Sequence, residues 1–508
     1  MKRDRRRVSI GGKAGRTLTM GLLLLAGCTT VGPDYEPPEL AVPGAWQEPL
    51  GQGLETGDAP LQTWWSVFDD PTLDGLIDQA TAGNLTLEQA FARIRQARAA
   101  LGVARGERFP AVDGEGSITR ERLSEGIGEA APPRGGQVDT FRGTGLDASW
   151  EIDFFGRITR SIEAASGEFE ASVEDYRDIL VVLYGDIART YVELRTFQER
   201  LAVANENVRI QRNSLGLARD RYRAELAPLL DVRQAEQNLA STEATVPQFE
   251  EGIARAINRL SVLVGEVPGA LHAALVEPQP IPMPPAENRV SEPVDVVRQR
   301  PDIRRAERLL AAQTARIGVA TADLYPRFSL SGMFAYETYS GSLLQGDNIA
   351  FSFGPAFSWN LFDGGRVRGV IDIQDAATEE ALGAYEETVL TALEEVENAI
   401  VGFTKETERL GALVRSQDAA AQSVRLVRTL YTTGLTDFQN VLDSERTMFS
   451  QQDQTVVSLG RRTTQLIDLY MALGGGWQNE PESVDAELAN RDKQLLPILG
   501  YNLIELDM

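Results

Sequence analysis

Residues 349–366 read IAFSFGPAFSWNLFDGGR, and this stretch decides the fold. Large apolar residues alternate with small or polar ones from 348 to 361, which is the period-two pattern of a β-strand with one apolar face. Strands of about 9–11 residues with this alternation are typical of membrane-spanning strands, although a strand in a soluble sandwich alternates in the same way. After Arg366 the apolar period changes to three and four residues, and no proline occurs from Ala356 to Glu480. The sequence therefore predicts a strand that leads directly into a very long helix.

The same pattern occurs twice in the chain, because matching residues recur 209 positions apart. The first copy has Trp150 and Gly156-Arg157 where the second has Trp359 and Gly365-Arg366. The matches continue through Tyr222/Tyr431, Val232/Val441, Glu236/Glu445 and Gly265/Gly474. An earlier segment that ends at Pro110 matches one that ends at Pro326, with an offset of 216. We therefore expect a tandem duplication, with copies at 70–270 and 291–478 joined by a proline-rich linker at 271–290.

Each copy is predicted to contain a helix, two strands and a long helical hairpin. The first helix covers Leu85 to Arg108 and ends before Pro110, because proline cannot continue a helix. Each long helix breaks once, at 224–228 and at 432–434, where proline or glycine indicates the tip of an antiparallel hairpin. The predicted fold class is mixed and mainly α, with coiled-coil-like hairpins and four strands per chain. Alternation places these strands at 112–118, 146–154, 328–336 and 348–361.

The amino terminus has the pattern of a lipoprotein signal peptide. A basic head precedes a short apolar stretch that ends in Leu25-Ala-Gly-Cys28, so residues 1–27 are predicted to be the signal. Cys28 is the only cysteine of the chain and follows the small residues directly, which resembles a lipobox and predicts acylation of Cys28. Thr29 rather than aspartate comes next, which favours the outer membrane by resemblance to lipoprotein sorting rules. Residues 28–69 would then form an extended, lipid-anchored segment, and 479–508 a carboxyl-terminal tail.

The composition excludes several classes of function. The chain of 508 residues has a formal net charge of −24, which repels nucleic acid. A single cysteine and a single histidine, His272, exclude disulfides and cysteine-based metal sites. The sequence also contains no glycine-rich phosphate loop or paired catalytic motif. We therefore predict no enzyme activity, no cofactor, no metal site and no nucleic-acid partner.

Taken together, these features resemble the TolC/OprM-like outer-membrane efflux proteins, in particular their lipoprotein branch. The resemblance covers nearly the whole chain after the signal. The residues that carry it are Cys28 to Pro38, the pair Trp64-Trp65, the run Arg300-Pro-Asp-Ile-Arg-Arg-Ala-Glu307, and Tyr431 to Asp443. It implies a homotrimer with a 12-stranded β-barrel in the outer-membrane lipid and a 12-helix α-barrel in the periplasm. It also implies a role as the exit duct of a tripartite efflux pump, with a periplasmic adaptor and an inner-membrane transporter of the RND type as partners.

The same resemblance indicates a gate at the periplasmic tips of the hairpins, where family members have a ring of carboxylates. Matching the tip motif residue by residue assigns Asp443 to this ring and Asn440 to a second position where some members have aspartate. The internal repeat places Asp231 opposite Asn440 and Gln234 opposite Asp443. The alternative is that these are solvated residues on helix faces. Pro247 predicts a kink in the returning helix of the first hairpin and has no match in the second. We therefore expect the second, proline-free hairpin to carry the moving part.

Two other functions fit parts of the sequence. The exit duct of a type I protein secretion system would have the same fold, and the lipid anchor favours small-molecule efflux over it. A periplasmic adaptor lipoprotein would have one hairpin beside a lipoyl-like domain, which the duplication argues against. The sequence does not name the substrate.

Overall fold

The computed structural model describes residues 30–39, 42–122, 124, 138–339 and 341–479. Cys28 and the predicted signal and tail therefore lie outside the described residues. The chain forms two compact units, one within residues 1–38, 96–171 and 307–384, the other within 39–95, 172–306 and 385–508. Each unit contains parts of both sequence repeats, so the compact units do not coincide with the repeats.

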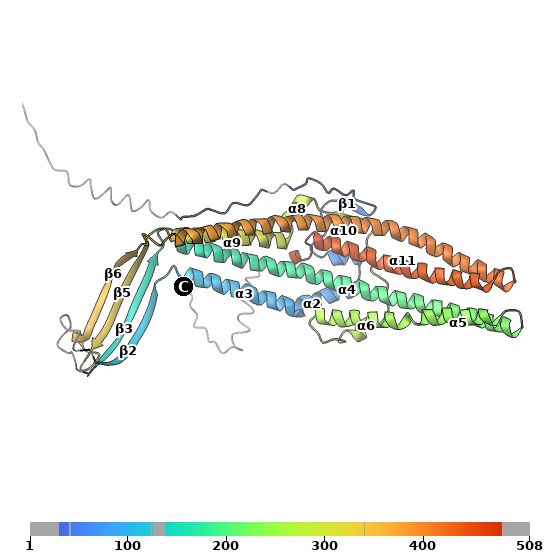
Figure 1. The fold of residues 1–508 in the computed structure, drawn as a ribbon, viewed down its shortest axis with the longest axis horizontal. Coiled ribbons are helices and arrows are strands. Elements are labelled where there is room, and N and C mark those ends of the chain that lie inside the picture. Colours follow the sequence, from blue (N-terminus) through green and yellow to red (C-terminus); the bar gives the residue numbers. More distant parts are fainter. Residues whose placement is uncertain (1–29, 40–41, 123, 125–137, 340, 480–508) are drawn as a thin grey trace, which may run out of the picture. The chain divides into compact units, whose positions relative to one another are not determined.

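The first unit contains a four-stranded antiparallel sheet, with the order β2-β3-β5-β6 (Figure 1). All four predicted strands are present: β2 (Ala111–Arg122), β3 (Val138–Ile152), β5 (Arg327–Thr338) and β6 (Ile349–Ser358). The prediction was too short for β3, because its first residues include only Val138 and Phe141 as apolar residues, three positions apart, and so lack the period-two alternation. Backbone pairing with β2 extends the strand there, from Ala111↔Ser149 to Arg122↔Val138.

The amino-terminal segment of this unit is held by a buried arginine. Arg160 is 4% exposed, and its guanidinium donates to the carbonyl oxygens of Val31 (3.1 Å) and Gly32 (3.3 Å). The same group pairs with Asp34 at 2.7 Å. Gly32 has a φ of +88° and lies directly against the backbone of Gly318, where a side chain would clash. The sequence motif after Cys28 is therefore a docking segment for the helices that carry Arg160 and Gly318.

Two helices of equal length follow the strand pairs, α4 (Arg157–Arg223) and α10 (Arg366–Thr432), each of 67 residues. Their tips use the same turn. The residues at equivalent positions, Glu225 and Gly434, have φ values of 59° and 75°. In both tips the next amide donates to the carbonyl five residues earlier, at 2.8 Å. This is a Schellman turn, which satisfies the last carbonyls of a helix. The predicted hairpin tips are confirmed.

The returning helices differ as predicted from Pro247. The first return is interrupted between α5 (Leu229–Glu243) and α6 (Val246–Leu263), where Pro247 has no N–H to donate. The second return is one helix, α11 (Phe438–Ala472).

The second unit has an apolar core around Trp64, which is fully buried and stacks on Tyr470 with ring centroids 5.6 Å apart. The elements that surround it are β1 (Leu54–Thr56), paired in parallel with β4 (Asn288–Val290), and several helices. The remaining elements of the chain are η1 (Trp64–Phe68), α2 (Pro71–Gly83), α3 (Leu85–Gly106), α7 (His272–Leu275), α8 (Pro293–Gln299), α9 (Pro301–Ala322), η2 (Gly346–Asn348) and η3 (Trp477–Asn479). Within the described ranges, every helix is too short or too polar to cross a lipid bilayer.

Candidate gate at the hairpin tips

A small apolar core joins the two hairpins near their tips. Tyr431 and Phe438 are 4% and 2% exposed, and their ring centroids lie 5.1 Å apart. The other members of this core come from α4, α5 and α11: Leu215, Ala218, Val232, Ala235, Val441 and Leu442. Because residues of both hairpins share the core, a movement of one hairpin at this level must break contacts with the other.

Arg221 holds the end of α10 against the first hairpin. Its guanidinium lies 4.7 Å from the centre of the Tyr431 ring and donates to the carbonyl oxygens of Tyr431 (2.9 Å) and Thr432 (3.3 Å). A cation at the carboxyl end of a helix stabilises its unpaired carbonyls. The Tyr431 hydroxyl donates to the Asp231 carboxylate at 3.4 Å. Burial raises the pKa of Asp231, which shows that this carboxylate is partly withdrawn from water.

The structure places the four predicted gate residues on the two returning helices. Asp443 and Asn440 are exposed on α11, while Asp231 and Gln234 are half-buried on α5. Asp443 accepts a hydrogen bond from Gln439 at 2.9 Å and lies 3.4 Å from the guanidinium of Arg446. The Asn440 side chain donates to Thr436 at 2.8 Å. Among the described residues, no hydrogen bond or ion pair joins two of these four, so within one chain they are separate.

Farther from the tip, a buried carboxylate connects three helices. Glu445 of α11 is 0% exposed and accepts a short hydrogen bond from the hydroxyl of Ser214 on α4. Arg428 of α10 lies 3.4 Å from Glu445 and donates to Ser214 at 2.6 Å and to the Ile210 carbonyl at 3.0 Å. Burial raises the pKa of Glu445, so the charged form depends on this one cation and the hydroxyl. We call Ser214, Arg428 and Glu445 the polar knot.

The sequence prediction missed the polar knot, although the repeat contains a signal for it. Arg428 and Glu445 correspond to Arg219 and Glu236, which also pair, at 2.8 Å. In the first hairpin that pair is more accessible, with side chains 50% and 31% exposed, and Glu236 also pairs with Arg233 at 2.8 Å. A duplicated arginine–glutamate pair was therefore visible in the repeat, but its burial in the second hairpin was not.

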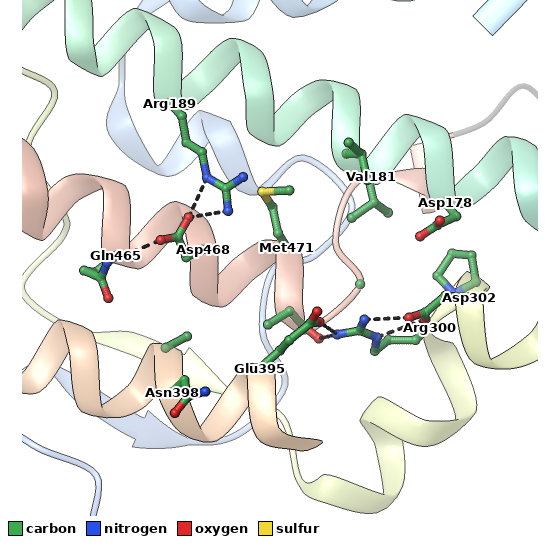
Figure 2. A pocket seen from close by; sticks show the side chains of 15 residues that line it. Asp178, Val181, Arg189, Arg300, Asp302, Glu395, Asn398, Gln465, Asp468 and Met471 are labelled. Carbon is green, nitrogen blue, oxygen red and sulfur yellow. Dashed lines mark hydrogen bonds and ion pairs between the residues drawn. The ribbon is translucent and has the colours of Figure 1, made fainter. Parts of the chain in front are cut away.

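A separate cavity of about 610 Å³ lies in the second unit, between α4, α10 and α11 (Figure 2). Arg300, which the sequence motif contains, forms one wall. Its guanidinium pairs with Asp302 at 2.6 Å and Glu395 at 2.7 Å, and it also donates to the Ala472 carbonyl at 2.7 Å. Figure 2 shows Asp178 beside Arg300 and Asp302. Burial and the nearby Asp302 raise the pKa of Asp178 to about 6, while Arg300 opposes the shift.

Replacing Asp178 with asparagine should stabilise the protein at neutral pH. The pKa of Asp178 is about 6 in the folded protein and 3.8 ordinarily, so the folded state binds this proton more tightly. Ionisation of Asp178 therefore lowers the stability of the folded protein as the pH rises from about 4 to about 6. Above that range the loss of stability is complete. The substitution removes a penalty of roughly 3 kcal/mol at pH 7.5 and flattens the dependence between pH 4 and 6. Thermal unfolding of both proteins across this pH range measures it, and an unchanged slope would assign the proton to another group.

Comparison with known proteins identifies the family. The family model described as "Outer membrane efflux protein" matches residues 76–266 and 293–475. The chain belongs to the outer membrane efflux protein family. Its sequence is 32% identical over 466 residues to nodulation protein T of Rhizobium leguminosarum bv. trifolii, covering 90% of this chain and 96% of that protein. It is 31% identical over 463 residues to the toluene efflux pump outer membrane protein TtgI of Pseudomonas putida, covering 90% and 97%.

Among solved structures, the chain is similar to the outer-membrane channel OprN. The two share 36% sequence identity and a TM-score of 0.82, over 88% of this chain and 99% of that one. This agreement confirms the resemblance and the mainly helical fold with a four-stranded sheet per chain. It also confirms the predicted class of function, an outer-membrane efflux duct. Nothing in the comparisons supports the alternative of a type I secretion duct.

Proposed function

We propose that three copies of this chain form a continuous passive duct whose closed end is at the hairpin tips. Four strands per chain give twelve in a trimer, which is enough to close a barrel that side chains alone would not fill. Strands β2 and β6 each pair on one side in the described chain, so both edges are open for a neighbouring copy. The large apolar residues of β6 support the same assembly, since Phe351 and Phe353 are 70% and 83% exposed in one chain.

The gate of this duct is formed by the tip residues of the second hairpin. Asp443 supports this role because it is an exposed carboxylate close to the tip, held in place by Gln439 and Arg446. Three symmetry copies would bring like charges together, which favours cations or protonation at the constriction. Asn440 on α11 and Asp231 on α5 contribute neutral and acidic positions nearer the turn, and Gln234 follows three residues farther along α5. Opening requires α10 and α11 to separate from α4 at the apolar tip core and the polar knot.

The tips also supply the docking surface for a periplasmic adaptor. Leu226 and Leu435 occupy equivalent positions of the two turns and are 68% and 74% exposed. Exposed leucines at the ends of adjacent hairpins suit an apolar contact with a helical partner. The adaptor would connect the duct to an inner-membrane transporter of the RND type. Small organic molecules are the proposed cargo, since the similar TtgI is a component of a toluene efflux pump.

The lipid anchor at Cys28 is part of the same proposal. Residue Thr30 packs against Gly156, at the junction between β3 and α4. The amide of Val31 donates to the carbonyl of Phe155 at 3.1 Å. Thr30 therefore lies at the end of the strands that faces the inner leaflet in the proposed barrel, which suits an acyl anchor shortly before it in the sequence. Mass spectrometry of the mature protein tests the acylation.

Replacing Asp443 with alanine should raise the conductance of the purified trimer in a planar bilayer. Removing the carboxylate deletes its contacts with Gln439 and Arg446 and the charge of the ring. We expect a several-fold higher conductance and a weaker dependence on divalent cations, because three opposed carboxylates attract them. Asp220→Ala on α4 is the matched control, because this exposed carboxylate also lies 3.4 Å from an arginine three residues on, Arg223, and is not part of the proposed gate. An intact trimer with unchanged conductance would remove Asp443 from the gate.

The strands predict a preference of the duct for cations. Asp113 and Asp147 are directly opposite each other on β2 and β3, on the face that carries the acidic residues of the strands and fewer large apolar ones. In a trimer, three such pairs would line the lumen with negative charge and concentrate cations there. Reversal potentials in a salt gradient should show cation selectivity in the wild type and a marked loss of it in Asp113→Asn/Asp147→Asn. Equal selectivity of the two proteins contradicts this assignment of the lumen face.

A further inference from the structure

The sheet of the first unit separates its charges between two faces. The register of the strands determines which residues share a face, because paired residues lie side by side. Asp147, for example, pairs with Asp113 on one side and Met333 on the other. Every acidic residue of the four strands lies on this one face: Asp113, Glu115, Glu121, Asp139, Asp147, Glu151 and Glu337.

The opposite face is apolar over most of its length. Leu146 pairs with Gly114 and Phe334, and Phe334 in turn pairs with Phe351, so a row of this face crosses all four strands. Successive rows run from the end of the sheet near the helices, at Phe357, to Tyr336. An exposed apolar face of this extent is the surface that the proposed barrel would turn toward lipid.

Three arginines follow the last apolar residues of that face. Arg142 pairs directly with Ile118, while Arg120 and Arg122 are the next two residues of β2 on the same face. Arg120 and Arg142 are diagonal neighbours, with a separation of about 7–8 Å between backbone positions. Arg120 and Arg122 are exposed, and Arg142 is half-buried. We call these three residues the arginine cluster.

The position of the arginine cluster determines which leaflet it would meet. Strand β2 begins after helix α3 and strand β3 leads into helix α4, so the helices join the sheet at the other end. Because the helices occupy the periplasm in the proposed duct, the arginine cluster lies at the outer leaflet. Guanidinium groups form bidentate hydrogen bonds with phosphate, and the adjacent apolar rows would contact acyl chains.

We propose that Arg120, Arg122 and Arg142 bind the phosphate groups of an outer-leaflet phosphorylated glycolipid, of the lipid A type. The inference rests on the proposed barrel, because only then does the apolar face meet lipid. A soluble phosphate would match the arginines but would leave the apolar rows without a partner. A phospholipid of the inner leaflet would lie at the opposite end of the strands.

The test titrates purified trimers with bisphosphorylated lipid A and follows thermal stability, with native mass spectrometry to count bound lipid. Arg120→Gln/Arg122→Gln/Arg142→Gln should weaken the apparent affinity on the order of a hundredfold, since each arginine near an anionic surface contributes roughly a factor of five. Glu121→Gln/Asp139→Asn is the matched control, because these paired residues occupy the same end of the opposite face. We expect the control to bind lipid A like the wild type.

Conductance measured on the same preparations distinguishes the lipid-site proposal from the proposed duct on which it rests. If the triple variant conducts and still binds lipid A with wild-type affinity, the arginine cluster is not a lipid site. The proposed duct is unaffected by that result. Equal binding of dephosphorylated lipid A, phosphatidylglycerol or inorganic phosphate would overturn the proposed ligand. A wild-type protein that forms no conducting trimer overturns the proposed duct, and the lipid-facing assignment of the sheet with it.

Discussion

Replacing Arg428 with methionine should loosen the second hairpin strongly, because it leaves the Glu445 carboxylate buried without a cation. Loss of one partner of a buried ion pair costs about 3–5 kcal/mol. A third of the Arg428 side chain is exposed, so we expect a smaller local loss of roughly 2 kcal/mol. Amide hydrogen exchange of α11 should accelerate correspondingly, and the conductance of the trimer should rise because α10 and α11 separate more easily from α4.

The chain provides a matched control for this experiment in its other copy. Arg219→Met breaks the equivalent contact with Glu236, which keeps a second cation, Arg233, at 2.8 Å, so the substitution should leave both exchange and conductance unchanged. The double variant Arg428→Met/Glu445→Leu removes the orphaned charge together with its partner and should recover much of the lost stability. If Arg428→Met and Arg219→Met behave alike, burial of the polar knot has no role in holding the hairpins together.

Replacing Tyr431 with alanine should disrupt the tip core by about 3 kcal/mol, within the range for loss of a buried aromatic ring. The substitution removes the contact with Phe438, the ring beneath the Arg221 guanidinium and the hydroxyl that donates to Asp231. We expect faster hydrogen exchange over the last turns of α10 and a duct that conducts more readily.

Tyr222 is the repeat-equivalent control for this prediction. It is 44% exposed, and Tyr222→Ala should change local stability by less than about 1 kcal/mol. Tyr431→Phe separates packing from hydrogen bonding, because it keeps the ring and removes only the 3.4 Å bond to Asp231. A conductance increase in Tyr431→Phe as large as in Tyr431→Ala would show that the hydrogen bond, rather than the packing, keeps the tip closed.

Both predictions depend on differences between the two matching hairpins. The partly exposed pair Arg219–Glu236 corresponds to a pair whose carboxylate, Glu445, is fully buried, and the exposed Tyr222 corresponds to a buried tyrosine. The first return is also broken near Pro247, whereas α11 is continuous. The second hairpin therefore has the tighter contacts at its tip and the more rigid return, which suits a part that moves as a unit.

The sequence by itself determined the elements of this protein. The alternation before Ser358, the glycine before α10 and the arginine that begins it, and the breaks at Glu225 and Gly434 are local signals. Strand period, helix continuity and turn geometry depend on neighbouring residues. The duplication also followed from the sequence, as did the family. The same signals underestimated β3, where backbone pairing with β2 replaces apolar alternation.

Only the tertiary structure decided which side chains are buried and which residues share a face. The repeat places Glu236 and Glu445 at equivalent positions, but Glu445 is fully buried against Ser214 of the other hairpin, whereas 31% of the Glu236 side chain is exposed. Asp443, Asn440, Asp231 and Gln234 were assigned through the motif and the repeat, while the polar knot and the arginine cluster appeared only in the packed structure. The physical reason is that burial, and therefore the cost of an unpaired charge, depends on which distant element packs against a residue.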